Sequence, residues 1–215
     1  GEMYNSGLPI PPGFVVTTNS YKEFVKSIST EIYQKLNNLD VENNTALQAT
    51  AKEIQELILK NQIPQDMQDQ IIEAYNSLSQ FSQEQASFVA VRSSATAEDS
   101  AEASFAGQNA TYLNIKGLQR VTAAVKACWA SLFTARSIYY RIKNNFPHDK
   151  VFIAVVVQKM VNSEKAGVMF SVNPISQNKN EIVIEGTYGL GEAVVSGAVT
   201  PDEYIVNKEN LEVIS

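Results

Sequence analysis

The chain has 215 residues, of which 44% are hydrophobic and 19% charged, and its formal net charge is −6. This composition is typical of a soluble globular protein, and a chain of this size buries about 70% of its unfolded surface without disulfides or a structural metal. It contains neither the Lys/Arg-rich run of a nucleic-acid-binding protein nor the ~20 apolar residues of a membrane span. We therefore expect no nucleic-acid or membrane partner and, since we find no signal peptide, a cytoplasmic location.

The first third of the chain reads as one strand followed by three helices. The proline- and glycine-rich opening leads into a strand at residues 14–17, and Thr18 or Asn19 can cap a helix with apolar residues at helical spacing as far as Ile32. Thr45 is placed to cap a second helix. Pro64 suits the first turn of a third.

The main functional signal is the change from apolar or small residues at 87–91 to polar residues directly after them. These apolar or small residues predict a buried strand, and Arg92 opens a loop of hydroxyl-bearing and small residues before a second strand at residues 111–115. An arginine followed by hydroxyls at a strand end can hold a polyphosphate. A surface loop in which Arg92 pairs with Glu98 or Asp99 is the alternative that spacing alone leaves open.

Residues 117–145 form the longest segment with helical periodicity. We expect Arg136 and Arg141 in its second half to be solvated or to complement the helix dipole. The single cysteine, Cys128, lies inside this pattern, which leaves no disulfide framework and no cysteine-based zinc site. The single histidine, His148, follows in a polar turn and is expected to be a solvated loop residue.

The composition of the sequence changes after this helix, and we place a domain boundary there. The two predicted domains are residues 1–148 and 149–215. The apolar, β-branched run 151–157 predicts a central strand that ends in the polar and adaptable residues 158–161. Three further extended segments separated by short turns indicate an antiparallel sheet in the second domain. These segments are residues 167–172, 181–185 and 203–206.

Residues 188–197 contain a Gly-x-Gly sequence after a strand, as a dinucleotide-binding fingerprint does. The spacing of the next glycine is wrong, and Gly197 and Pro201 leave little room for the helix that would hold a pyrophosphate. We therefore interpret this stretch as a flexible glycine-rich connection.

Five stretches stand in an order that resembles the N-terminal nucleotide-binding domain of the phosphoenolpyruvate synthase and pyruvate phosphate dikinase family. They are Pro9–Phe14, Val91–Asp99, Ala103–Gln108, Gly167–Ser171 and Tyr188–Glu192. The resemblance spans essentially the whole chain, and residues 199–204 look more like the synthase branch of the family. It marks the chain as a piece of something longer, incomplete at both ends.

The resemblance implies an α+β fold of the ATP-grasp type, with ATP held between a helix-rich lobe with a sheet and an antiparallel sheet lobe. By motif, Arg92 would be the catalytic contact to the phosphates, and Gly107 and Thr111 would lie in the loop that covers them. Gln158 to Val161, including Met160, would form the hinge against which adenine sits. A soft apolar wall and backbone groups after a strand suit that role.

The family's parent enzyme converts pyruvate, ATP and water to phosphoenolpyruvate, AMP and phosphate through a phosphohistidine on a separate domain. The resemblance places the phosphate-binding lysine before Gly1 and the magnesium ligands after Ser215, so no metal ligand is expected in this chain. Because phosphoryl transfer depends on positioning and metal charge, the isolated piece should be close to inactive. Two alternatives stay open: the ATP-binding domain of a rifampicin phosphotransferase, and a stand-alone, non-catalytic nucleotide-binding module.

Overall fold

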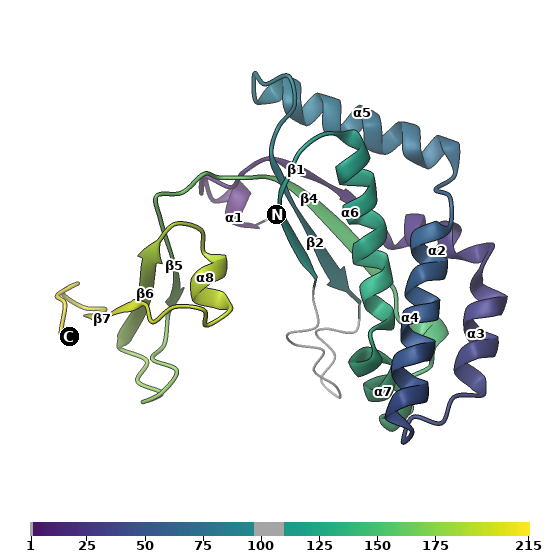
Figure 1. The fold of residues 1–215 in the computed structure, drawn as a ribbon. Helices are drawn as coiled ribbons and strands as arrows, with labels where there is room; N and C mark the ends of the chain where they lie inside the picture. The colour runs from purple at the N-terminus through teal and green to yellow at the C-terminus, as the bar shows by residue number, and fades with distance from the viewer. Residues whose placement is uncertain (1, 97–109) are drawn as a thin grey trace. The chain divides into compact units, whose positions relative to one another are not determined.

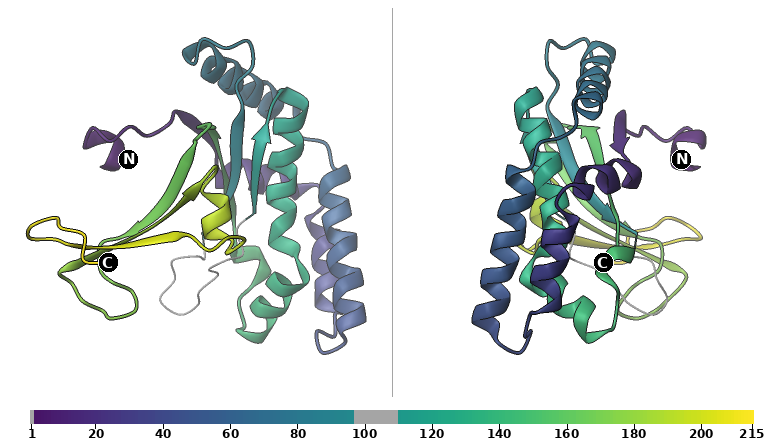
Figure 2. Two further views of the ribbon diagram at one scale, coloured as in Figure 1. Left: turned by 60° about the vertical axis from the view of Figure 1, so that its left-hand side comes forward. Right: turned by 90° about the vertical axis from the view of Figure 1, so that its right-hand side faces the viewer.

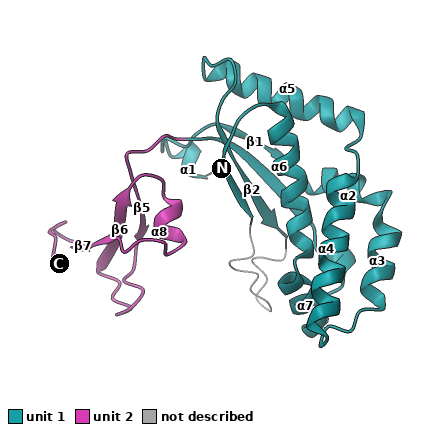
Figure 3. Cartoon of the chain, in the orientation of Figure 1, with its two compact units in different colours: residues 1–160 teal, residues 161–215 magenta. Residues whose placement is uncertain are grey.

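The computed structural model describes residues 2–96 and 110–215. The chain forms two compact units, residues 1–160 and 161–215 (Figure 3). The predicted boundary at 148/149 therefore lies too early. The reason is that the strand β4 (Ile153–Lys159), which we had assigned to the second domain, pairs with strands of the first unit on both of its sides.

The sheet of the first unit has four strands in the order β1-β4-β2-β3, and every neighbouring pair is antiparallel. The other three strands are β1 (Gly13–Val16), β2 (Val89–Ala95) and β3 (Thr111–Ile115). The apolar β4 lies inside this sheet, as its β-branched composition predicts.

Helices cover one face of this sheet (Figures 1 and 2). They are α2 (Thr18–Lys26), α3 (Ser29–Asn37), α4 (Asn44–Lys60), α5 (Gln65–Phe81), α6 (Leu118–Ala130) and α7 (Ala135–Lys143); a short α1 (Glu2–Asn5) precedes β1. The long helix α6 lies against β2, β3 and β4, and α4 packs on α6. The core between them includes the fully buried Trp129, whose ring centroid lies 4.4 Å from that of Phe24.

The helix starts differ from the prediction by one or two residues. Thr17 caps α2 by accepting a hydrogen bond from the Ser20 amide, and Asn43 caps α4 by accepting one from the Ala46 amide. Pro64 precedes α5 as its N-cap residue. The first predicted helix is two helices, since the chain breaks between α2 and α3.

The long periodic segment is also divided, at Thr134, which caps α7 by accepting a hydrogen bond from the Ser137 amide. A short 3₁₀ turn, Ser131–Phe133, joins α6 to α7. The break turns Arg141 inward, so that its side chain is 1% exposed and its predicted solvation is wrong. It does lie in the last turn of α7, where a positive charge complements the helix dipole. Its guanidinium donates to the Leu132 carbonyl and lies 5.2 Å from the Phe133 ring centroid.

His148, in the 3₁₀ turn His148–Lys150, is also less solvated than predicted. Its Nδ1 atom is buried without a hydrogen-bond partner among the described residues. Burial, with the nearby positive charge of Arg141, lowers the pKa of His148 to about 4. The imidazole is therefore neutral at neutral pH.

The second unit contains a three-stranded antiparallel sheet in the order β5-β6-β7, which confirms the predicted pairing type for the last three strands. Its strands are β5 (Lys165–Phe170), β6 (Glu181–Tyr188) and β7 (Asp202–Asn207). The glycine-rich stretch after β6 is not a simple flexible connection. It contains one helical turn, α8 (Glu192–Val195), because Val194 is buried against β5 and β6.

Candidate nucleotide site

The face of the first sheet opposite the helices carries the predicted site residues. Along β2, Val89, Val91 and Ser93 are buried toward the helices, whereas Arg92 and Ser94 alternate with them and are exposed. We call this second face the open face. It consists of Gly13 and Val15 on β1, Ala154, Val156 and Gln158 on β4, Ala90, Arg92 and Ser94 on β2, and Thr111 on β3.

Arg92 lies inside β2 and not at its end, because the strand continues through Ala95. Its pairing partners are Val156 on one side and Thr111 on the other, so the Thr111 side chain stands beside that of Arg92 on the open face. No described residue forms an ion pair with Arg92. The alternative partners Glu98 and Asp99 lie outside the described residues.

Gln158 lies on the same face as Arg92, because its strand partner Ala90 is two positions before Arg92 along β2. That separation corresponds to about 7 Å along the strands. The Gln158 side chain does not extend freely from the sheet. Its amide nitrogen donates to the Pro11 carbonyl over 3.0 Å and so holds the segment that leads into β1.

Met160 follows β4 and is partly buried, and its amide donates to the Phe88 carbonyl over 2.8 Å. Phe88 is 45% exposed, and the Lys116 ammonium lies 4.7 Å from its ring centroid. The alternation along β4 places Met160 on the same side as Gln158. The open face is therefore apolar near Met160 and positively charged at Arg92.

Four of the five predicted residues therefore gather around one face of one sheet: Arg92, Thr111, Gln158 and Met160. Gly107, the fifth, lies outside the described residues. Sequence reasoning missed Gly13, which faces Gln158 across the β1–β4 pair. A Cβ atom on Gly13 would stand 2.5 Å from the Val157 carbonyl oxygen, so only glycine permits this close approach. The run Pro11-Pro12-Gly13 was the available signal.

The described residues offer no group of three or more histidine, cysteine, aspartate or glutamate side chains that could hold a metal ion. Nor does any described helix have the length and apolarity to cross a membrane.

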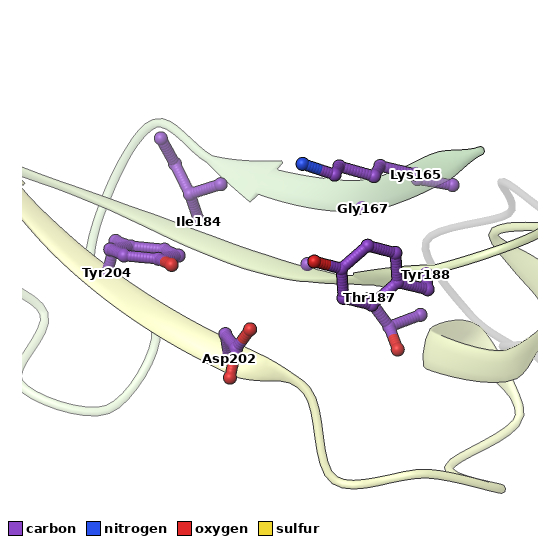
Figure 4. A pocket seen from close by; sticks show the side chains of 9 residues that line it. Lys165, Gly167, Ile184, Thr187, Tyr188, Asp202 and Tyr204 are labelled. Carbon is purple, nitrogen blue, oxygen red and sulfur yellow. The ribbon is translucent and has the colours of Figure 1, made fainter. Parts of the chain in front are cut away.

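A separate hollow of about 400 Å³ lies on one face of the second unit's sheet (Figure 4). Gly167 and Gly186 face each other across β5 and β6 and leave its floor without side chains. Tyr188 and Tyr204 stand over it, and the Lys165 ammonium lies 5.3 Å from the Tyr188 ring centroid. None of the predicted site residues lines this hollow.

Residues 1–215 match the family described as pyruvate phosphate dikinase, AMP/ATP-binding domain. The chain belongs to this family. The resemblance read from its five motifs is thereby confirmed, and the coarse fold, α+β with two antiparallel sheets, agrees with the prediction.

Proteins named phosphoenolpyruvate synthase or probable phosphoenolpyruvate synthase are similar to the chain over nearly all of its length. The protein of Methanocaldococcus jannaschii is 55% identical over 100% of this chain and 18% of its own length. That of Methanothermobacter thermautotrophicus is 53% identical over 97% of the chain and 31% of its own length. That of Pyrococcus furiosus is 47% identical over 97% and 30%. The chain thus spans less than a third of the relatives that it matches.

Proposed function

We propose that this chain is the ATP-binding part of a cytoplasmic phosphoenolpyruvate synthase and that its two units are the two lobes of an ATP-grasp domain. The complete enzyme would phosphorylate pyruvate with ATP and water, giving phosphoenolpyruvate, AMP and phosphate. A phosphohistidine on a separate domain would carry the group to pyruvate bound elsewhere in the protein. The names of the relatives favour this function over a rifampicin phosphotransferase or a stand-alone binding module.

The proposal rests on one observation: Arg92 and the end of β4 lie on the same open face of the sheet. Adenine would lie at the Met160 end of this face, near the small side chain of Ala90 and the glycine at position 13. The ribose would span the two-residue step toward Arg92. The phosphates would then meet a permanently charged, fork-shaped donor with no ion-pair partner among the described residues.

Thr111 would add a hydroxyl donor beside Arg92, and Gly107 would belong to the segment that covers the phosphates. A magnesium ion, when bound with ATP, would neutralise phosphate charge, with ligands from outside the described residues. This chain would therefore contribute to catalysis by binding and orienting the nucleotide. Arg92 would stabilise charge on the transferred group.

The test is Arg92→Ala in the full-length protein, with Arg136→Ala as the matched control, because Arg136 is exposed on α7. We expect ATP-dependent phosphorylation of the histidine domain to fall about 10²- to 10³-fold in the first variant, as when a charge-stabilising donor is removed. The control should retain the wild-type rate, and both variants should melt within a degree or two of wild type.

The opposite pattern would contradict the proposal. If Arg92→Ala lowers the melting temperature while turnover per folded molecule stays normal, Arg92 supports the fold and does not bind phosphate.

A further inference from the structure

The backbone groups of Arg92 point away from Thr111, its partner on β3. The Ser93 amide donates to the Ala110 carbonyl over 2.9 Å, so the backbone groups of Ser93 point toward β3. Successive residues of a strand point these groups to opposite neighbours, and those of Arg92 therefore point toward β4. In a pair of this kind the side chains lie close, with Cβ atoms about 4.5–5.5 Å apart. Their alignment depends on the hydrogen bonds of the neighbouring pairs.

On one side of this pair, β3 contains an extra residue. Between the pairs Val89–Ile115 and Val91–Tyr112, β3 holds one residue more than β2. The extra residue is accommodated at Asn114, whose φ of 57° is left-handed, a conformation that asparagine tolerates. Because of this bulge, Tyr112 and Ile115 both pack against the core although they are three positions apart.

A shift of β3 by one residue would separate the two residues proposed to bind phosphate. Side chains alternate between the faces of a strand, so the shift would turn Thr111 from the open face toward the helices. The bulge makes this shift a real alternative, because losing the bulge moves the beginning of β3 by one position relative to Arg92. A contact at the beginning of β3 would select the observed register.

Ser93 supplies such a contact. Its side chain is buried on the helix face, next to Arg92 in sequence. Its hydroxyl accepts a hydrogen bond from the Ala110 amide at 2.7 Å, in addition to the amide-to-carbonyl bond between the same two residues. In a shifted register this buried hydrogen bond would be lost, which is costly inside a protein. Ser93 therefore favours the register in which Thr111 stands beside Arg92.

We propose that Ser93 is a positioning residue for phosphate binding: its hydroxyl fixes the register of β3 that brings Thr111 beside Arg92. This inference rests on the proposed ATP-binding function. Arg92 supplies a charge and Thr111 a short, directional donor, and the two can contact one phosphate group only when they stand side by side. Ser93 itself touches no phosphate, because its side chain lies on the opposite face of the sheet.

The experiment removes hydroxyl groups singly and in combination in the full-length protein. Ser93→Ala removes the register contact, Thr111→Val removes the phosphate donor at nearly constant shape, and a double variant combines the two. Ser79→Ala is the matched control, because Ser79 is also buried and its hydroxyl accepts a hydrogen bond from the Ser87 amide at 3.1 Å, before the other end of β2. The measurements are kcat/KM for ATP in phosphorylation of the histidine domain, and the melting temperature.

We expect Ser93→Ala to lower kcat/KM about 3- to 10-fold, the value of one hydrogen bond, and Thr111→Val to lower it at least as much. In the double variant, Ser93→Ala should add less than about twofold, since the hydroxyl that it positions is already absent. Ser79→Ala should lower the melting temperature as Ser93→Ala does, with kcat/KM unchanged. Ser93→Cys keeps the volume but offers a weak acceptor, so it should show the same loss if the alanine variant does not fold.

Three results would overturn the inference. A loss from Ser93→Ala that persists in full beside Thr111→Val would mean that Ser93 acts by another route. An equal loss in Ser79→Ala would mean a general effect of stability, and a wild-type kcat/KM in Ser93→Ala or Thr111→Val would mean that the register does not matter. All three leave the proposed function intact. An unchanged rate in Arg92→Ala would instead refute the proposed function itself.

Discussion

Replacing Arg141 tests whether its stem or its charge stabilises the first unit. The side chain is 1% exposed, and its guanidinium contacts the Leu132 carbonyl and the Phe133 ring. Burial lowers the pKa of Arg141 to about 10, which corresponds to a cost of about 3 kcal/mol for keeping the charge in the core. Losing the charge-assisted bond to Leu132 would cost about 1.5–3 kcal/mol. The cost of burying the charge and the loss of this hydrogen bond nearly cancel. The packing of the aliphatic stem should therefore decide how far a substitution changes the free energy of unfolding.

We therefore expect Arg141→Met, which keeps an unbranched stem, to lie within about 1 kcal/mol of wild type in the free energy of unfolding. Arg141→Ala removes the stem as well and should cost about 2–5 kcal/mol. Urea unfolding followed by tryptophan fluorescence isolates this unit, because Trp129 is the only tryptophan and lies in its core. If the Met variant is as unstable as the Ala variant, the polar contacts outweigh the packing and the reasoning is refuted.

Three further predictions use the same urea assay or a thiol assay. His148 has a folded pKa of about 4, below its unfolded value, so its contribution is present above about pH 6.5 and lost as the pH falls toward 4. Because the ring is partly exposed, we expect a loss of about 1 kcal/mol, which His148→Gln should abolish; an unchanged pH profile in that variant would contradict this. Burial raises the pKa of the Cys128 thiol to about 12, so a thiol reagent should label it only in denaturant, and rapid labelling of the native chain would disprove its burial. Gly13→Ala should cost about 1–3 kcal/mol by pushing β1 from Val157, whereas an unshifted urea midpoint would show that the strands can separate freely.

Local patterns in the sequence located most of the helices and strands, although not all of their breaks and ends, but they did not assign the strands to sheets. The run 151–157 is apolar enough to identify a central strand, yet nothing within it says which strands lie beside it. Its partners in β1 and β2 are distant in sequence, and such pairings depend on the whole chain. This explains why the domain boundary was placed before β4, although the antiparallel pairing of the last three strands was predicted correctly.

Arg141 was misjudged because one continuous helix was assumed. In such a helix the apolar stripe includes Tyr139, which is in fact 39% exposed, while Ile138 is fully buried. The cap at Thr134 starts a new helix, and the buried face of α7 is offset from that of α6. A threonine inside a periodic segment was a signal for this break, but its side chain can also point to solvent in an unbroken helix.

The strand around Arg92 shows how a polar sequence can still obey the two-residue period of a sheet. Val89 and Val91 are buried, so continuing the alternation places Ser93 inward and Arg92 and Ser94 outward. Ser93 tolerates the interior because its hydroxyl accepts a hydrogen bond from the Ala110 amide at 2.7 Å. A small side chain with a local partner thus lets β2 continue past the point where hydrophobicity ends. The same extension moves Arg92 from a loop onto a rigid strand, where a cation can be aimed at a ligand with less conformational freedom to lose.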